Sequence, residues 1–358
     1  MGAPQTPRWT WIWPVLAWVV LSVTFLLGVA GPIDAAAGVI LLATVFAAVY
    51  HAEVVAHRVG EPFGTLILAL AVTVIETALI ISVMISAPAE KAGLARDTVF
   101  AAVMIVCNGI VGLCLLMGAA RFREQGFQIQ GASAAMAVLA ALTSLTLILP
   151  NFAARELGPL YSMPQLVFAG LISLVLYGSF IFVQTVRHRD YFLTEDHEED
   201  THAPPPTKKA TVLSVSLLLV SLVAIVGLAK VLTPTLEFGI AHLDLPKAVV
   251  GIIIAALVLL PECLAALKAA QRNRLQTSLN LALGSALATI GLTIPAVAAV
   301  SITLGQRLEL GLDVKDQVLL ALTLLLGMIT LGTGRTTVLQ GIVHLVIFAV
   351  FLFFAVVP

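Results

Sequence analysis

Two glutamates lie deep inside apolar runs of this sequence, at matching places in its two halves. Glu76 comes twelve residues after Gly64, and Glu262 comes eleven residues after Gly251. A carboxylate within a bilayer costs about 2.5–3.5 kcal/mol on insertion scales unless it is paired or neutralised. No Arg or Lys lies within the apolar runs 63–86, 97–120 or 277–304 to pair with either residue. A proton, a bound cation or a water-filled cavity is therefore expected at each glutamate.

Two such carboxylates indicate a site that takes either a hard cation or protons. Ca²⁺ is bound by about 6–8 oxygens from carboxylates, amides, carbonyls and water. Burial favours the protonated form of a carboxyl group, so the empty site should bind protons, and cation and protons would compete. That competition is the minimum chemistry of an antiporter. The candidate neutral ligands are the amides and hydroxyls of the same or the following apolar run: Asn108, Asn280, Thr73 and Ser285, with Thr65, Ser278 and Thr289 as further oxygens.

A structural role is the alternative for each of these side chains. Glutamates and asparagines in membrane helices also form hydrogen bonds between helices. Asn108 and Asn280 are each followed four residues later by a glycine, Gly112 and Gly284, which places amide and glycine on one helix face. The two glycines are expected to allow close helix approach in either interpretation.

The elements that would position these residues are membrane-spanning helices. The chain has 358 residues, of which 60% are hydrophobic and 11% charged, whereas a soluble domain has about 25% charged residues. Its net charge of -1 and scattered Lys and Arg exclude a nucleic-acid partner. Since one crossing needs about 20 apolar residues, the sequence predicts an all-α polytopic membrane protein with about eleven transmembrane helices: 11–30, 34–57, 63–86, 97–120, 132–150, 165–186, 210–232, 247–270, 277–304, 316–332 and 338–356. The long run 277–304 is expected to tilt or to break near Gly284 or Gly291.

The spacing of the two glutamates predicts an inverted repeat. Glu76 falls in the third predicted helix and Glu262 in the eighth, and an odd offset reverses the direction of crossing. The predicted organisation is an N-terminal helix (1–32), a first five-helix repeat (33–186), an acidic cytoplasmic loop (187–209) and a second five-helix repeat (210–358). A cytoplasmic N-terminus places twelve Lys and Arg inside against seven outside, as the positive-inside rule favours.

Two further groups of polar residues are weaker candidates. His51, Glu53 and His57, with Glu61 nearby, end the second predicted helix. Their spacing differs from the His-Glu-x-x-His of zinc proteases, so a cluster that guides cations or protons and a plain solvated helix end both stay open. The acidic run 195–200 is either a sensor of pH or Ca²⁺ or a disordered linker.

These motifs resemble those of a known family. The segment from Gly60 to Glu76 resembles the first α-repeat of bacterial calcium/proton antiporters of the ChaA type, within the cation/calcium exchanger superfamily, and Leu260-Pro261-Glu262 resembles the second. The resemblance implies that Glu76 and Glu262 bind the cation. The Gly-Asn pair that many members carry before each glutamate is absent, and no Gln follows Gly284-Ser285, which leaves Ca²⁺, Na⁺ and K⁺ open as the transported ion.

The resulting hypothesis is a secondary active cation/proton antiporter, with Ca²⁺/H⁺ exchange by alternating access as the first choice. The alternatives are a Na⁺(K⁺)/H⁺ antiporter on the same scaffold and a cation channel, for which no repeated selectivity ring is visible. We expect no enzymatic activity and no cofactor. The expected partners are inorganic cations, protons and the lipid bilayer of a bacterial inner (plasma) membrane.

Overall fold

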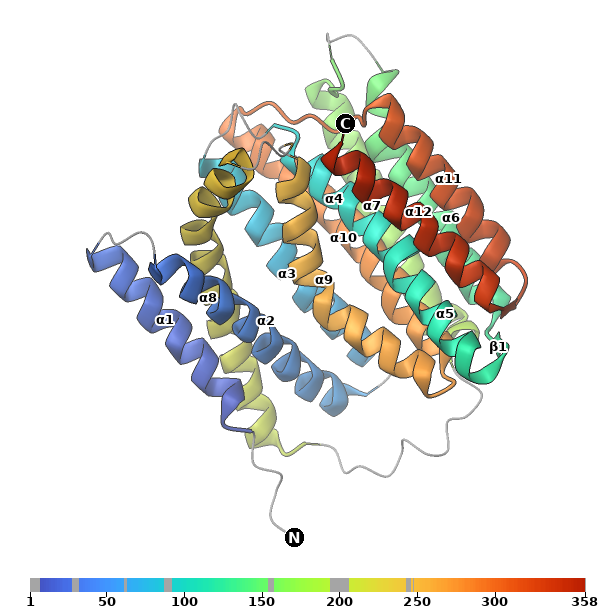
Figure 1. Cartoon of the computed structure of the whole chain (residues 1–358), viewed down its shortest axis with the longest axis horizontal. Helices are drawn as coiled ribbons and strands as arrows, with labels where there is room; N and C mark the ends of the chain where they lie inside the picture. Colours follow the sequence, from blue (N-terminus) through green and yellow to red (C-terminus); the bar gives the residue numbers. More distant parts are fainter. Residues whose placement is uncertain are drawn as a thin grey trace. The chain divides into compact units, whose positions relative to one another are not determined.

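The computed structural model describes residues 7–27, 32–60, 63–86, 92–153, 158–193, 206–242, 246 and 248–357, and nearly all of them are helical (Figure 1). The elements are α1 (Trp9–Leu27), α2 (Pro32–Val59), α3 (Phe63–Ser86), α4 (Leu94–Met104), η1 (Ile105–Ile110), α5 (Val111–Phe122), β1 (Gln125–Gly126), α6 (Ile129–Thr143), η2 (Ser144–Ile148), η3 (Leu149–Asn151), α7 (Met163–Phe182), η4 (Val183–Arg187), η5 (Arg189–Phe192), α8 (Lys208–His242), α9 (Ala248–Gln271), α10 (Leu275–Leu304), α11 (Val314–Leu331), β2 (Arg335–Thr336) and α12 (Val338–Val356).

The helices confirm the predicted membrane architecture. Ten of the described helical segments are long and apolar enough to cross a bilayer, and α3 adds a shorter apolar stretch, Ala69–Ser82. Each of these eleven coincides with one of the eleven predicted spans. Three spans contain a turn of π-helix, which the sequence did not predict: η1 between α4 and α5, η2 after α6, and η4 after α7.

The structure changes two details of the prediction. Of the two alternatives for the run 277–304, a tilt or a break, the break does not occur, because α10 is one α-helix from Leu275 to Leu304. A glycine inside a helix costs only about 1 kcal/mol, and the packing of this largely buried helix outweighs that cost. The helix of the seventh span is longer than predicted: α8 continues through Pro234 to His242 and has 35 residues in all, about 52 Å at 1.5 Å per residue, although its candidate membrane span ends at Thr235.

The chain forms two compact units, and neither is one of the predicted halves. Unit 1 comprises Met1–Val83 and Glu198–Leu245, and unit 2 comprises Met84–His197 and Pro246–Pro358. Unit 1 therefore contains α1, α2, most of α3, and α8, and unit 2 contains the other helices. Each unit takes helices from both halves of the sequence, so the two five-helix repeats remain a hypothesis about internal similarity and are not separate bodies.

Within unit 1 the helices alternate in direction as predicted. The hydroxyl of Thr44 in α2 lies 3.3 Å from the carbonyl of Trp13 in α1, and His51 lies 3.1 Å from the carbonyl of Thr10, so α1 and α2 are antiparallel. Trp18 donates to the carbonyl of Val220 at 3.2 Å, and Gly227 approaches Leu21, so α1 and α8 are parallel. Spans one and seven, both odd-numbered, thus run the same way.

Unit 2 shows the same alternation. Gly251 of α9 approaches the backbone of Thr98 in α4, and Gln271 at the end of α9 lies 3.9 Å from the sulfur of Met117 in α5. Spans four and eight are therefore parallel neighbours. α12 runs antiparallel to them, since Gly109 packs on Phe348 while Gly112 packs on His344. β1 and β2 pair in a two-residue ladder that joins the loop after α5 to the loop before α12.

Candidate cation site

The two glutamates occupy equivalent depths in their own helices. Glu76 lies thirteen residues after Phe63, the first residue of α3, which is about 20 Å along the axis. Glu262 lies fourteen residues after Ala248, the first residue of α9, which is about 21 Å. The side chain of Glu76 is completely buried, and that of Glu262 is 5% exposed. Both carboxyl groups are therefore well inside a hydrocarbon layer about 30 Å thick.

Unit 2 places Asn108 nearly level with Glu262. The helices α4–η1–α5 and α9 lie side by side over most of their length (Figure 1), and Gly251 marks the level of Thr98. Glu262 is eleven residues after Gly251, and Gly109 is eleven residues after Thr98. Since parallel helices advance together at about 1.5 Å per residue, Glu262 stands level with Gly109, and so within one residue of the height of Asn108, on two packed helices.

Asn108 belongs to a buried hydrogen-bonded network that joins three spans. It lies in the π-helical turn η1 and is completely buried, and π-helical turns are frequent at functional sites. Its amide nitrogen donates to the hydroxyl of Thr323 in α11 at 2.8 Å. Its amide oxygen lies 3.1 Å from Nδ1 of His344 in α12, and Nε2 of the same ring lies 3.1 Å from the hydroxyl of Thr330. The hydrogen-bonding role weighed for Asn108 is thus realised, and one lone pair of its oxygen is used.

Asn280 is placed differently, although its spacing to a glycine is the same. It lies only five residues into α10, about 8 Å from the helix start, whereas Asn108 lies fourteen residues after Leu94. Its amide nitrogen donates to the carbonyl of Phe192 at 2.5 Å, and its oxygen accepts from Gln276 at 2.8 Å. Thr289 is the residue that lies fourteen positions after the first residue of α10, as Asn108 lies fourteen after Leu94, and it is buried.

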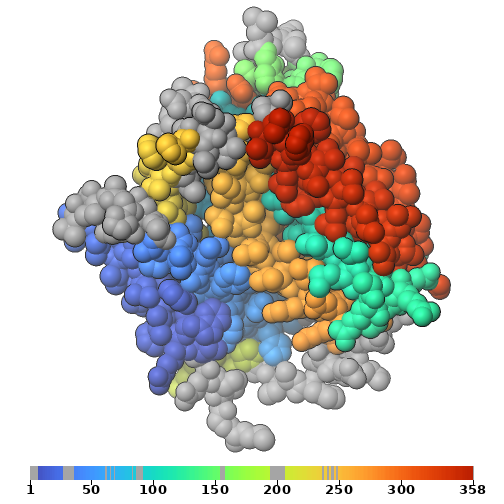
Figure 2. Space-filling view, in the orientation of Figure 1, coloured from blue at the N-terminus to red at the C-terminus, as the bar shows by residue number. Residues whose placement is uncertain are grey.

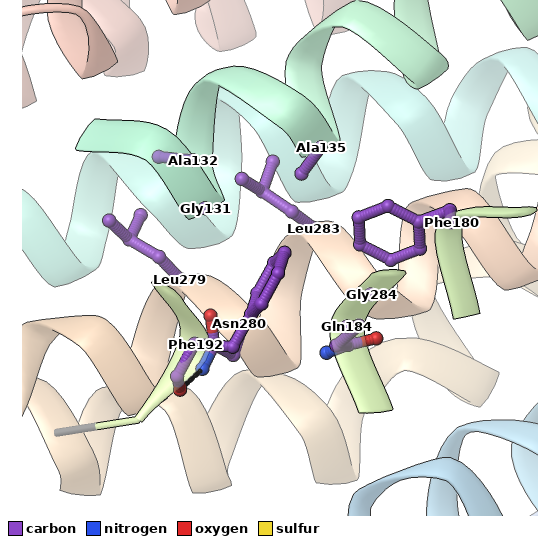
Figure 3. Close-up of a pocket in the computed structure, with 10 residues that line it drawn as sticks. All are labelled: Gly131, Ala132, Ala135, Phe180, Gln184, Phe192, Leu279, Asn280, Leu283 and Gly284. Carbon is purple, nitrogen blue, oxygen red and sulfur yellow. Dashed lines mark hydrogen bonds between the residues drawn. The ribbon is translucent and has the colours of Figure 1, made fainter. Parts of the chain in front are cut away.

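Gly284 does not serve close helix approach, in contrast to Gly112. A Cβ added to Gly112 would lie 3.0 Å from the Cβ of His344, but no atom in the described part of the chain lies within 4 Å of a Cβ added to Gly284. Gly284 instead lines a small pocket, together with Asn280, Gln184 and the rings of Phe180 and Phe192 (Figure 3). The prediction of close packing is confirmed for the first glycine and wrong for the second.

The two hydroxyl candidates lie within their helices at useful depth. Thr73 is buried, three residues before Glu76 on α3, and its hydroxyl donates to the carbonyl of Ala69 at 2.8 Å. Because that bond uses the proton, the oxygen of Thr73 keeps lone pairs that a cation can use. Ser285 is 3% exposed and lies ten residues after Leu275, about 15 Å into α10.

The peripheral residues at the end of α2 lie in different environments. His51 is completely buried and lies 3.2 Å from the hydroxyl of Ser214 and 3.1 Å from the carbonyl of Thr10. Glu53 and His57 are exposed instead, and Glu61 lies outside the described residues, as does the acidic run 195–200. Across the described part of the chain, no three His, Cys, Asp or Glu side chains come together as a metal site.

Sequence reasoning missed the partners of Asn108. His344, Thr323 and Thr330 are buried polar residues of the last two spans, and a histidine within an apolar run of 19 residues is unusual enough to be noticed. Nothing in the sequence pairs that histidine with an asparagine 236 positions earlier.

Comparison with known proteins places the chain in a family. The family model described as sodium/calcium exchanger protein matches residues 11–186 and 213–357. The chain is 50% identical, over 99% of its length and 97% of the relative's, to the putative ionic transporter y4hA of Sinorhizobium fredii. It is 36% identical, over 95% of its length and 94% of the relative's, to the sodium-potassium/proton antiporter ChaA of Escherichia coli.

Solved structures share its fold at low sequence identity. YfkE is 15% identical with a TM-score of 0.73, and the match covers 98% of this chain and all of that one. The H⁺/Ca²⁺ exchanger CAX is 15% identical with a TM-score of 0.71, over 96% of this chain and 88% of that one. With a family model that matches both halves and relatives that align over nearly its whole length, this integral membrane protein belongs to the sodium/calcium exchanger family.

Proposed function

We propose that the protein is a secondary active antiporter that exchanges Ca²⁺ for protons, and that Glu76 and Glu262 are the carboxylates that bind both. The observation that carries the proposal is the pair of buried carboxyl groups, one in each half of the sequence, at about 20 Å and 21 Å along their helices. Membership of an exchanger family supports it.

The charge of the site explains why two carboxylates would couple cation flux to proton flux. Two carboxylates that bind one Ca²⁺ form a neutral site, and so do two carboxyl groups that each carry a proton. The empty site has two negative charges, which are costly to hold in a low-dielectric region. Alternating access is therefore favoured when the site is loaded with either ion and disfavoured when it is empty. That restriction is what makes an exchanger.

A second candidate is Na⁺(K⁺)/H⁺ exchange on the same scaffold. It is favoured by one observation, the 36% identity to a sodium-potassium/proton antiporter over nearly the whole chain. A single Na⁺ neutralises only one of the two carboxylates, so this reaction needs a second Na⁺ or a proton held on the other.

We also propose where the protein works. The distribution of Lys and Arg, twelve against seven, supports a cytoplasmic N-terminus. The bacterial relatives support the inner membrane as its location. Ca²⁺, Na⁺ or K⁺ would then be exported from the cytoplasm as protons enter.

Proton flux in everted vesicles tests the function. A pH gradient is imposed, and Ca²⁺, Na⁺ or K⁺ is added in turn to wild type and to the Glu76→Gln and Glu262→Gln variants. We expect Ca²⁺ to dissipate the gradient in wild type and neither variant to respond above empty vesicles, because an amide neither ionises nor accepts the proton. Glu124→Gln is the matched control, since that carboxylate is 58% exposed beside Arg335.

Each outcome of this experiment is informative. A response to Na⁺ or K⁺ but not to Ca²⁺ would establish the second candidate. Wild-type behaviour of both glutamate variants would mean that the two residues are structural and that the proposed site is wrong.

A further inference from the structure

The structure assigns a role to a residue outside the proposed ligands: we propose that His344 is a positioning residue that holds the amide of Asn108 in the orientation for cation binding. This inference rests on the proposed function. It is carried by the contact between Nδ1 of His344 and the amide oxygen of Asn108 at 3.1 Å, and by the heights of Asn108 and Glu262 on neighbouring helices, which agree to within one residue.

The hydrogen bonds around Asn108 have a single consistent direction. Thr323 uses its proton on the carbonyl of Leu319 at 2.7 Å, so its oxygen accepts from the amide nitrogen of Asn108 at 2.8 Å. The amide oxygen therefore faces His344, and Nδ1 of the ring carries the proton. Nε2 then accepts from the hydroxyl of Thr330. A neutral imidazole in one tautomer satisfies both side-chain contacts of the ring, so the amide of Asn108 is held at both ends.

Close packing of α12 on α5 holds the side chain of His344 in the interior of unit 2. Gly341, one turn before His344, lies against the backbone of Leu116, and Gly112 lies against His344 itself. The outer face of α12 is apolar and exposed, with Leu339 at 68%, and Figure 2 shows α12 on the surface of unit 2. His344 is 1% exposed. Its position is therefore determined by two close glycine contacts.

The held amide remains able to bind a cation. An amide oxygen has two lone pairs, and His344 occupies one of them. We infer that the second is the one a cation at the height of Glu262 would use. In metal sites, groups that orient a ligand through a hydrogen bond typically contribute about 10–100-fold in metal affinity or activity. His344 would act in this way on Asn108, without touching the ion.

Two substitutions of His344 distinguish the hydrogen bond at Nδ1 of its ring from the one at Nε2. The amide nitrogen of an asparagine at 344 lies near the place of Nδ1, so His344→Asn keeps the bond to Asn108 and loses the one to Thr330. His344→Gln reaches the place of Nε2, so it keeps Thr330 and loses Asn108. The assay is cation-dependent proton flux with the ion that wild type transports. We expect His344→Gln to raise the half-saturating cation concentration roughly tenfold or more with little loss of maximal rate, and His344→Asn to stay near wild type.

A second comparison tests whether His344 acts through Asn108. In an Asn108→Ala background, His344→Gln should cause no further rise in the half-saturating concentration, because effects on one interaction are not additive. If His344→Gln fails to fold, Thr323→Val removes the other bond to Asn108 and should cause a similar rise. Thr98→Val is its control, since that buried hydroxyl donates to the carbonyl of Leu94 in its own helix at 2.8 Å.

The outcomes separate this inference from the function on which it rests. Equal behaviour of His344→Asn and His344→Gln, or a rise that persists without Asn108, overturns the inference and leaves the exchanger intact. A wild-type protein that moves no protons in response to any cation overturns both.

Discussion

Two helix glycines in unit 2 should respond oppositely to the same substitution. A methyl group added to Gly341 of α12 would lie 2.5 Å from the backbone nitrogen of Leu116, 2.9 Å from its Cα and 3.0 Å from the carbonyl oxygen of Gly112. All three atoms belong to the backbone of α5, so no side chain can rotate away. A methyl group added to Gly284 of α10 would meet no atom of the described residues within 4 Å.

The magnitude follows from comparing the two variants. Replacing glycine by alanine inside a helix gains about 1 kcal/mol from propensity at either position. Overpacking of a close contact costs typically about 1–3 kcal/mol. Gly284→Ala should therefore be neutral or stabilising. Gly341→Ala should be less stable than Gly284→Ala by about 1–3 kcal/mol, because the shared propensity gain cancels in the difference.

Thermal unfolding in detergent, followed by circular dichroism, measures this difference. Tryptophan fluorescence is unsuitable, because all four tryptophans lie in α1 of unit 1. Gly341→Ala should also weaken cation binding, since it displaces α12 and with it His344. If Gly341→Ala proves as stable as Gly284→Ala, α12 does not pack closely on α5 at Gly341. The packing of α12 would then no longer explain how His344 is positioned against Asn108.

Two further predictions concern the ends of the helices in unit 2. Burial raises the pKa of Tyr161 to about 12, and its hydroxyl donates to the carbonyl of Leu145 at 2.5 Å. Only the protonated phenol makes that bond. The stability that the bond adds is therefore present below pH ~10 and is lost as the pH rises towards about 12. Unfolding measured from pH 9 to 12 should therefore show a smaller loss for Tyr161→Phe than for wild type, and equal losses would contradict this reasoning. The side chain of Arg96 is 15% exposed and donates to Asp97 at 2.7 Å and to the carbonyl of Gly311 at 3.2 Å, so Arg96→Gln should cost about 1–3 kcal/mol in the same unfolding assay. Asp97→Asn in that background should recover part of the loss, since the carboxylate that directly accepted from Arg96 is then neutral; an additive double variant would refute the pairing.

Composition and the length of the apolar runs were enough to identify the protein as an α-helical membrane protein. A chain that is 60% apolar and 11% charged cannot cover itself in water, and runs of about 20 apolar residues have one stable form in a bilayer, the helix. All eleven spans were predicted for that reason, together with the depth of Glu76 and Glu262, because depth along a helix depends only on residue count. Alternation of direction followed from the number of spans.

What the sequence could not supply were the contacts between helices distant in the chain. Asn108 and Asn280 have the same spacing to a glycine, yet one lies deep in a polar network and the other near a helix end, because spacing within a helix says nothing about where that helix begins or what packs on it. The pairing of His344 with Asn108 and the open space beside Gly284 were likewise decided by packing. So were the two units, which combine helices from both halves of the chain. Local propensity and hydropathy are properties of a segment, whereas a site depends on which segments meet, and only the tertiary structure determines that.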